Sequence, residues 1–171
     1  MTTWPNLFKL VIRGEFDKYL YDMYLFDAHK TTSRYSSILH FAVLGGNIET
    51  IQYLIENNVN VNSRNMNGET PLHWCCKEGN IEIAKLLIHH GANYTLTDFD
   101  RNSPLHWAVE YNNHEIVSYL LLKQVPLDGT NTNLLTPLKL AKLNYSKESM
   151  VLLKKYFSLQ NNETNQTSIT I

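Results

Sequence analysis

A single motif recurs along this chain of 171 residues at a constant spacing. It begins with Ser or Thr, usually followed by Pro, and continues with Leu and, in most copies, His. The copies occupy residues 37–40, 70–73, 103–106 and 136–139, so each begins 33 residues after the one before it. Self-similarity at a fixed period of roughly 20 to 50 residues is typical of proteins built by stacking copies of one unit. The sequence therefore predicts a repeat array.

The motif and the residues after it carry the signals of a helix with defined ends. A Ser or Thr side chain caps the first turn, and a Pro directly after it takes the first helical position, where no backbone N–H is needed. Gly46 and Gly79 follow in their units, and glycine readily adopts the left-handed conformation that ends a helix. Asn112 holds the same place in the third unit and is the next best residue for that conformation.

A second helix is expected after this turn. Residues 48–55, 81–88 and 116–122 place apolar side chains at helical spacing. The polar stretch at 91–102 then indicates a loop with a hairpin-like turn. Each unit thus consists of helix, turn, helix and loop, and we expect an all-α fold.

Residues 70–92 resemble an ankyrin repeat along nearly their full length. The Thr-Pro-Leu-His motif, the glycine turn and the ending with two leucines before Gly91-Ala92 all agree with that family. The resemblance implies an ankyrin-repeat solenoid of stacked helix-turn-helix units joined by hairpin-like loops. The expected boundaries are 1–31 for a degenerate N-terminal cap, 32–64, 65–97 and 98–130 for three units and 131–157 for a C-terminal cap, all within a domain at 1–157 that is followed by a disordered polar tail at 158–171.

Departures from the family pattern fall at the hairpin tips and in the last unit. Gly68 keeps the glycine of the tip, whereas Tyr35, Arg101 and Leu134 replace it. Because a side chain at positive φ costs about 1–2 kcal/mol, we expect these three tips to adopt a different turn. Lys139 replaces the motif histidine in the last unit, as suits a capping unit whose outer face meets water.

The composition argues against several kinds of partner and site of action. Lys and Arg number 15 against 16 for Asp and Glu, so the chain lacks a strong field to attract nucleic acid or an anionic membrane. No segment approaches the roughly 20 apolar residues of a membrane span, and the first residues do not resemble a secretion signal. Cys75 and Cys76 are adjacent on an expected helix, where their side chains point about 100° apart and do not easily bridge. We expect a cytoplasmic or nuclear protein that is a monomer by itself.

Seven histidines and two cysteines invite a metal hypothesis. His73, Cys75 and Cys76, with His89 and His90, form the densest cluster. Structural zinc sites usually pair ligands from two separate segments, and the sequence offers no second such pair. The resemblance instead implies that the motif histidines bridge neighbouring loops by hydrogen bonds. The sequence also lacks a nucleophile elbow and a glycine-rich phosphate loop. We expect no enzyme, no metal and no cofactor.

The resemblance implies that the hairpin tips and the exposed ends of the first helices bind a protein partner. Transferred position by position, the expected binding residues are Arg34, Arg64, Met66, Asn67, Glu69, Lys77, Glu78, Phe99, Asp100, Asn102, Glu110, Tyr111, Asn133 and Asn144. Because binding energy concentrates in a few large anchors, we expect Arg64, Met66, Phe99 and Tyr111 to contribute most. The mixed charges of this surface fit a partner of mixed or slightly basic character. The tryptophans at positions 74 and 107 are instead expected to belong to the core.

These inferences point to a non-catalytic module that binds another protein, as an adaptor or an inhibitor. One alternative is the N-terminal recognition segment of a larger enzyme or membrane protein. Another is a viral or parasite mimic of the inhibitors of NF-κB, to which small ankyrin proteins of this kind are similar. The sequence does not identify the partner.

Overall fold

A computed structural model describes residues 4–15 and 36–167 of the chain, and over these residues it contains nine helices and no strand. The first helices of successive units are α1 (Trp4–Arg13), α3 (Ile38–Gly45), α5 (Pro71–Glu78), α7 (Pro104–Glu110) and α9 (Pro137–Leu143). The second helices are α4 (Ile48–Glu56), α6 (Ile81–His89), α8 (His114–Leu122) and α10 (Lys147–Thr167). The expected all-α repeat array is confirmed.

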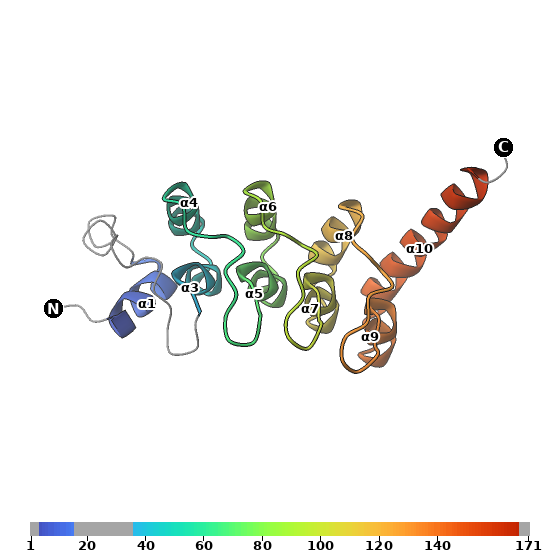
Figure 1. Ribbon diagram of the computed structural model, residues 1–171, viewed down its shortest axis with the longest axis horizontal. Coiled ribbons are helices and arrows are strands. Elements are labelled where there is room, and N and C mark those ends of the chain that lie inside the picture. The colour runs from blue at the N-terminus through green and yellow to red at the C-terminus, as the bar shows by residue number, and fades with distance from the viewer. Residues whose placement is uncertain (1–3, 16–35, 168–171) are drawn as a thin grey trace.

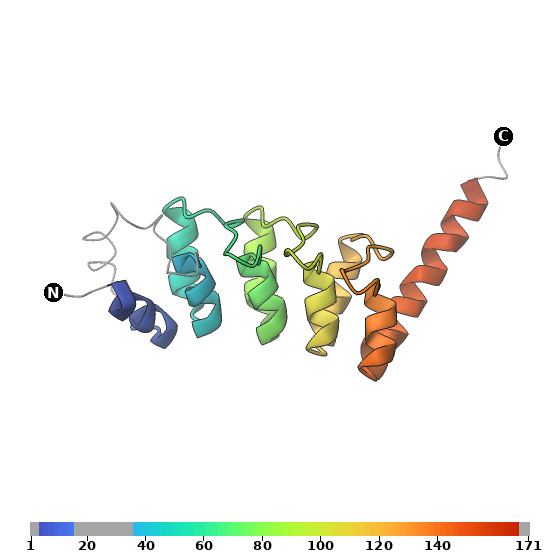
Figure 2. The same ribbon diagram turned by 60° about the horizontal axis from the view of Figure 1, so that its bottom comes forward.

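The helices form two rows along the molecule (Figure 1). In the row of first helices, each member packs on the next, from α1 through α3, α5 and α7 to α9. The second helices α4, α6 and α8 lie above this row in Figure 1, and the loops between units extend past the first helices on the opposite side. Figure 2 shows the same two rows from another side. One edge of the array thus consists of first helices together with hairpin tips.

The ends of the first helices follow the signals of the motif. Thr70, Ser103 and Thr136 adopt the extended conformation of an N-cap, and each is followed by Pro in the first turn. Gly46 and Gly79 end their helices in the left-handed conformation, with φ of 73° and 82°. The last two units keep the same turn without glycine, since Asn112 has a φ of 57° and Tyr145 a φ of 56°.

The prediction of different turns at the tips without glycine is wrong for Arg101 and Leu134. These residues have φ of 62° and 59°, close to the 77° of Gly68 in the equivalent place. The backbone N–H of Arg101 donates to Asp98 O at 3.1 Å, and that of Leu134 donates to Asn131 O at 3.0 Å. The hydrogen bonds within each tip therefore hold a conformation that an isolated side chain would disfavour. The tip at Tyr35 lies outside the described residues.

The core consists of one apolar layer per unit. Three of the four leucines of the motif are fully buried, at positions 39, 72 and 105. Leu138, in the last unit, is partly buried, because among the described residues no further unit covers it. This burial explains why the motif repeats: a single unit cannot exclude water from its own apolar face, and stacking buries that face between neighbours.

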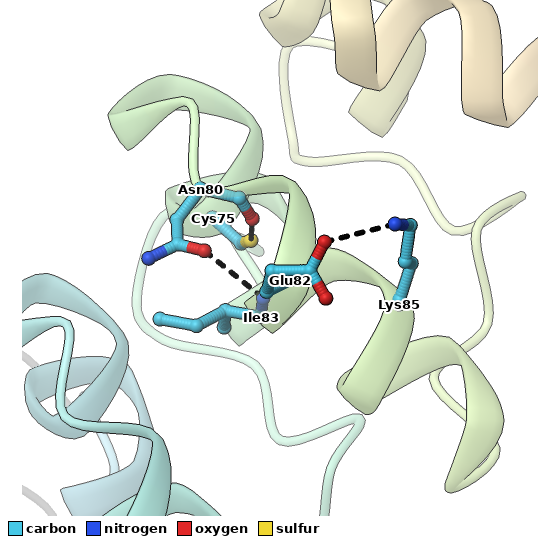
Figure 3. Close-up of polar contacts among 5 residues, drawn as sticks. All are labelled: Cys75, Asn80, Glu82, Ile83 and Lys85. Carbon is cyan, nitrogen blue, oxygen red and sulfur yellow. Dashed lines mark hydrogen bonds and ion pairs between the residues drawn. The ribbon is translucent and has the colours of Figure 1, made fainter.

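The turn between α5 and α6 shows how the two helices of one unit are joined (Figure 3). Asn80 Oδ1 accepts a hydrogen bond from the backbone N–H of Ile83 at 3.1 Å and so caps α6. The thiol of Cys75 donates to the carbonyl oxygen of Asn80 at 3.2 Å, and Lys85 pairs with Glu82 at 2.9 Å on the exposed side of α6. Cys75 is thus a structural residue that links the end of one helix to the start of the next.

The chain after Phe157 differs from the sequence prediction. We expected residues 158–171 to be disordered, but α10 continues to Thr167 and extends beyond the stack (Figure 1). Lengthening an existing helix needs no new nucleation, so a polar sequence can follow the apolar part of α10 in helical form. Residues 168–171 lie outside the described part, as does the second helix expected in the first unit, whereas α1 and the left-handed Gly14 agree with that unit's first half.

Candidate functional site

Each of the three described hairpin tips is organised by one Asn or Asp side chain. In the second unit, the backbone N–H of Asn65 donates to Glu69 O at 3.0 Å, and Asn65 Oδ1 accepts from the N–H groups of Asn67 and Glu69 at 2.9 and 3.0 Å. Asp98 and Asn131 hold the equivalent places in the next two tips, and both are buried. The tips are therefore fixed turns on the edge of the array.

Neighbouring tips are joined to one another through the backbone. The N–H of Phe99 donates to Asn67 O at 2.9 Å, and the N–H of Thr132 donates to Asp100 O at 2.9 Å. These bonds link three successive tips into one continuous edge. Side chains on this edge consequently have fixed positions relative to one another.

Two tryptophans connect the first helices to the tips. Trp74 Nε1 donates to Glu69 Oε2 at 2.7 Å, and Trp107 Nε1 donates to Asp98 Oδ2 at 3.0 Å. Burial tends to raise the pKa of Glu69, but the hydrogen bonds from Trp74, Asn65 and Asn67 stabilise its charged form, and the net result is a lowered pKa. The tryptophans are partly buried and pack against the core, in line with the expectation, but they also face the edge.

A cavity of about 450 Å³ lies between the tip at residues 65–69 and the first helices α3, α5 and α7. We call it the aromatic groove. The ring of Phe41 meets that of Trp74 edge to face, with centroids 5.8 Å apart. The groove is lined by Ser36, Phe41, Leu44, Asn65, Met66, Asn67, Glu69, Trp74, Lys77, Glu78 and Trp107.

A second cavity, of about 490 Å³, adjoins the first and shares Met66, Asn67, Glu69 and Trp107 with it. We call it the acidic groove, because four carboxylate residues and no Lys, Arg or His line it. Its lining consists of Met66, Asn67, Glu69, Asp98, Phe99, Asp100, Asn102, Trp107, Glu110 and Tyr111.

Two cations lie at the margins of these grooves, each over an aromatic ring. The guanidinium of Arg64 lies 5.6 Å from the centroid of Phe99 and donates to the carbonyl oxygen of Thr97. The ammonium of Lys77 lies 5.5 Å from the centroid of Tyr111. Phe99 also lies against the neighbouring tip, since a Cβ added to Gly68 would come within 2.7 Å of Phe99 Cδ1. Even so, Phe99 remains 66% exposed.

The structure brings together most of the residues that the sequence singled out. Met66, Asn67, Glu69, Lys77 and Glu78 line the aromatic groove. The acidic groove adds Phe99, Asp100, Asn102, Glu110 and Tyr111, while Arg64 lies at its margin. Asn133 and Asn144 are exposed and line neither groove. Arg34 lies outside the described residues.

Sequence reasoning missed several residues that line the grooves, namely Phe41, Leu44, Trp74, Asp98 and Trp107. The signal for three of them was present, because positions 41, 74 and 107 are equivalent in the repeat and all carry large aromatic side chains. An indole N–H seeks a hydrogen-bond acceptor when it is buried, and the carboxylates at 69 and 98 are such acceptors. The repeat pattern alone did not show that the carboxylates at 69 and 98 lie on the edge formed by the hairpin tips.

The motif histidines bridge successive units, as the resemblance implied. His73 Nε2 lies 3.1 Å from Asn102 O in the next tip, and His73 Nδ1 lies 2.8 Å from Thr70 Oγ1. Because a carbonyl oxygen only accepts, Nε2 carries the hydrogen and Nδ1 accepts. His40 and His106 make equivalent contacts, to Glu69 O and Leu135 O. Burial lowers the pKa of all three, in His40 to about 4.

The remaining candidates for chemistry are held in the core. Cys75 and Cys76 are free and buried, and burial raises the pKa of both thiols. Among residues 4–15 and 36–167 there is no group of three or more His, Cys, Asp or Glu side chains that could hold a metal ion. In the same part of the chain, no helix is both long enough and apolar enough to cross a bilayer.

Comparison with known proteins agrees with this architecture. A family model for three copies of the ankyrin repeat matches residues 6–98, and a model for a single ankyrin repeat matches residues 100–129. No curated protein matches the chain significantly. Among the described residues, the matched ranges contain the helices from α3 to α8, most of α1, and the tips that line the grooves. The chain therefore belongs to the ankyrin repeat family, whose arrays are protein–protein interaction modules.

Proposed function

We propose that this chain is a non-catalytic recognition module that holds its protein partner against the aromatic and acidic grooves, as an adaptor or an inhibitor that covers the partner's surface. The observation that carries the proposal is the pair of adjoining grooves on one fixed edge, with large side chains left exposed. Met66 is 52% exposed, Phe99 66% and Tyr111 45%. Side chains of this size usually supply the anchors of a protein interface.

The rigidity of the edge favours binding. Binding orders the side chains and loops of an interface, and each immobilised group opposes association. Here the tips are already joined by the bonds from Phe99 to Asn67 and from Thr132 to Asp100. The tryptophans are held by their carboxylate partners. The module therefore loses little conformational freedom when a partner binds.

A non-catalytic role is supported by the state of the motif histidines and the cysteines. General acid–base catalysis needs a titratable group that reaches the substrate. Both ring nitrogens of His40, His73 and His106 are engaged within the protein, and the two thiols are buried. Free buried thiols also fit the reducing conditions of the cytoplasm or nucleus, where we propose that the module acts.

The charge of the edge favours a protein over a nucleic acid. Four carboxylates line the acidic groove, and Glu78 adds another to the aromatic groove. Phosphate groups bind to surfaces rich in Lys and Arg, and an acidic groove repels them. Arg64 and Lys77 do not offset this charge inside the acidic groove, because they lie at its margin or in the adjoining groove.

The experiment that tests this function is capture of the partner from a lysate of cells that express the chain, followed by mass spectrometry. A variant with Met66→Ala, Phe99→Ala and Tyr111→Ala removes the exposed anchors of both grooves. The matched control carries Lys85→Ala, His89→Ala and Leu122→Ala, which alter exposed side chains on the second helices α6 and α8. Circular dichroism confirms that both variants remain folded.

We expect the wild type and the control to retain the same specific protein and the groove variant to lose it. If the groove variant retains the partner while the control loses it, binding occurs on the second helices and the proposal is wrong. A partner that is chemically altered by the chain would contradict a non-catalytic role.

A further inference from the structure

We propose that the acidic groove receives an arginine side chain from the protein partner, an inference that rests on the proposed function and specifies the chemistry of its binding surface. The grooves as a whole offer room for a peptide segment. The acidic groove adds a local preference, because its charge and its aromatic walls select one kind of side chain.

The carboxylates of the groove outnumber the two cations at its margins, Arg64 and Lys77. Glu69, Asp98, Asp100 and Glu110 contribute four carboxylates to its lining, and no cation lines it. Within the described part of the chain, neither Asp100 nor Glu110 forms an ion pair, and both are exposed. Like charges gathered in a cavity raise the local potential and attract a cation from outside.

The four carboxylates differ in how firmly hydrogen bonds hold them in place. Asp98 is buried and accepts hydrogen bonds from the backbone N–H of Asn102 at 2.7 Å and from the indole of Trp107 at 3.0 Å. Glu69 is likewise held by three donors. Asp100 and Glu110 are exposed at the mouth and can turn toward a bound group. The groove thus has two carboxylates in fixed positions, Asp98 and Glu69, and two that can move, Asp100 and Glu110.

Aromatic rings complete the groove. The rings of Trp107 and Tyr111 lie with centroids 5.9 Å apart and planes tilted by 37°, and Phe99 lies on the tip that precedes α7. A cation over an aromatic face gains electrostatic attraction, and a guanidinium also stacks as a plane. The chain already uses this chemistry at the margin, where Arg64 lies over Phe99 and Lys77 over Tyr111.

Arginine fits these features better than lysine. Its planar fork of N–H groups can bond two carboxylate oxygens at once, which a point-like ammonium group does not match. Its weaker hydration also lowers the cost of entering a groove lined by rings. A volume of about 490 Å³ accommodates the side chain and leaves room for the backbone that carries it.

The test uses short random peptides displayed on phage and selected against the full chain. The selected peptides are synthesised, and their dissociation constants are measured by fluorescence anisotropy. Each arginine is then replaced by citrulline, which keeps the shape of arginine without its charge, and by lysine. Two-dimensional NMR of the labelled protein, observing the indole resonance of Trp107, shows whether a peptide occupies the groove.

Two protein variants complete the experiment. Asp100→Asn with Glu110→Gln removes the movable charges without changing side-chain size. The matched control, Glu82→Gln with Glu115→Gln, removes two exposed charges from the second helices α6 and α8. We expect citrulline to weaken binding at least roughly tenfold, as for the loss of a charge-assisted hydrogen bond. The groove variant should bind the arginine peptide with similarly weakened affinity and should distinguish little between arginine and citrulline. The control variant should bind both peptides as the wild type does.

Two results would overturn the inference while leaving the proposed function in place. The first is a peptide that shifts the Trp107 indole but binds equally well with citrulline. The second is equal affinity for the arginine and the lysine peptides, which would mean that the groove binds any positively charged side chain. Failure of the proposed function has a different signature: the Met66, Phe99 and Tyr111 triple variant would then bind every selected peptide as well as the wild type does.

Discussion

The indole nitrogen of Trp107 donates to Oδ2 of Asp98 at 3.0 Å, and this bond links α7 to the tip that precedes it. Trp74 makes the equivalent bond to Glu69 at 2.7 Å, although the two carboxylates occupy different places in their tips. In the tip of Trp74 the acid stands at the end and Asn65 at the start, whereas in the tip of Trp107 the acid stands at the start and Asn102 at the end. The two tips thus form the same hydrogen-bond network with the acidic side chain and the Asn side chain in exchanged positions.

Replacing Trp107 by Phe should destabilise the protein by about 1–3 kcal/mol, because the buried Asp98 carboxylate loses a donor while the ring is largely preserved. Urea unfolding monitored by circular dichroism measures the change. The double variant Trp107→Phe with Asp98→Asn should lose less than the sum of the two single variants, since both remove the same interaction. Additive losses would show that the bond contributes nothing specific.

Replacing Leu72 by Ala should cost roughly 2–5 kcal/mol of unfolding free energy, because its side chain is 1% exposed and its removal leaves a cavity. Phe99→Ala should change the free energy of unfolding by far less, since Phe99 is 66% exposed. Urea unfolding of both variants under the same conditions compares them directly. Equal losses would mean that Phe99 serves the fold and would remove it from the binding surface.

The fold could be predicted from the sequence because the same helix-forming motif, weak evidence in one copy, recurs in several units. The capping residue, the proline and the leucine of the motif act in each unit, and Leu39, Leu72 and Leu105 are buried as expected. Most of the binding residues expected from the sequence also lie together, because they line the two adjoining grooves. The sequence did not show that the tryptophans serve both the core and the grooves, because that depends on where their indole nitrogens find acceptors in three dimensions.

The tips show a limit of local reasoning. A side chain at positive φ is disfavoured for an isolated turn, yet Arg101 and Leu134 keep the left-handed conformation of Gly68. Their neighbours on both sides are fixed by hydrogen bonds, among them those from Phe99 to Asn67 and from Thr132 to Asp100. The array therefore imposes on each tip a conformation that the local sequence alone does not favour.

This strain predicts that Arg101→Gly stabilises the protein by on the order of 1 kcal/mol, because glycine relieves the cost of positive φ and loses part of that gain to its greater unfolded-state freedom. Thermal unfolding of the variant measures the effect. The reverse change, Gly68→Ala, should destabilise, since φ is 77° and the added Cβ would lie 2.9 Å from Phe99 N. Destabilisation by Arg101→Gly would indicate that the arginine side chain has a structural role of its own.

Acid should weaken the array before it protonates most carboxylates. His40 is buried, and its pKa falls from 6.5 in the unfolded chain to about 4 in the folded chain, chiefly because burial disfavours the charged ring. The unfolded chain therefore takes up the proton first as the pH falls. The contribution of the neutral ring to stability is complete above pH 6.5 and is lost progressively as the pH decreases to about 4.

For His40 alone this loss amounts to about 3 kcal/mol, with further losses of the same sign from His73 and His106, whose pKa values are also lowered. Urea unfolding at a series of pH values between neutral and pH 4 measures it. A free energy of unfolding that stays constant over this range would mean that the motif histidines accept a proton without breaking their bridges. The stack would then depend on its leucine layers and not on the contacts from His40 to Glu69 and from His73 to Asn102.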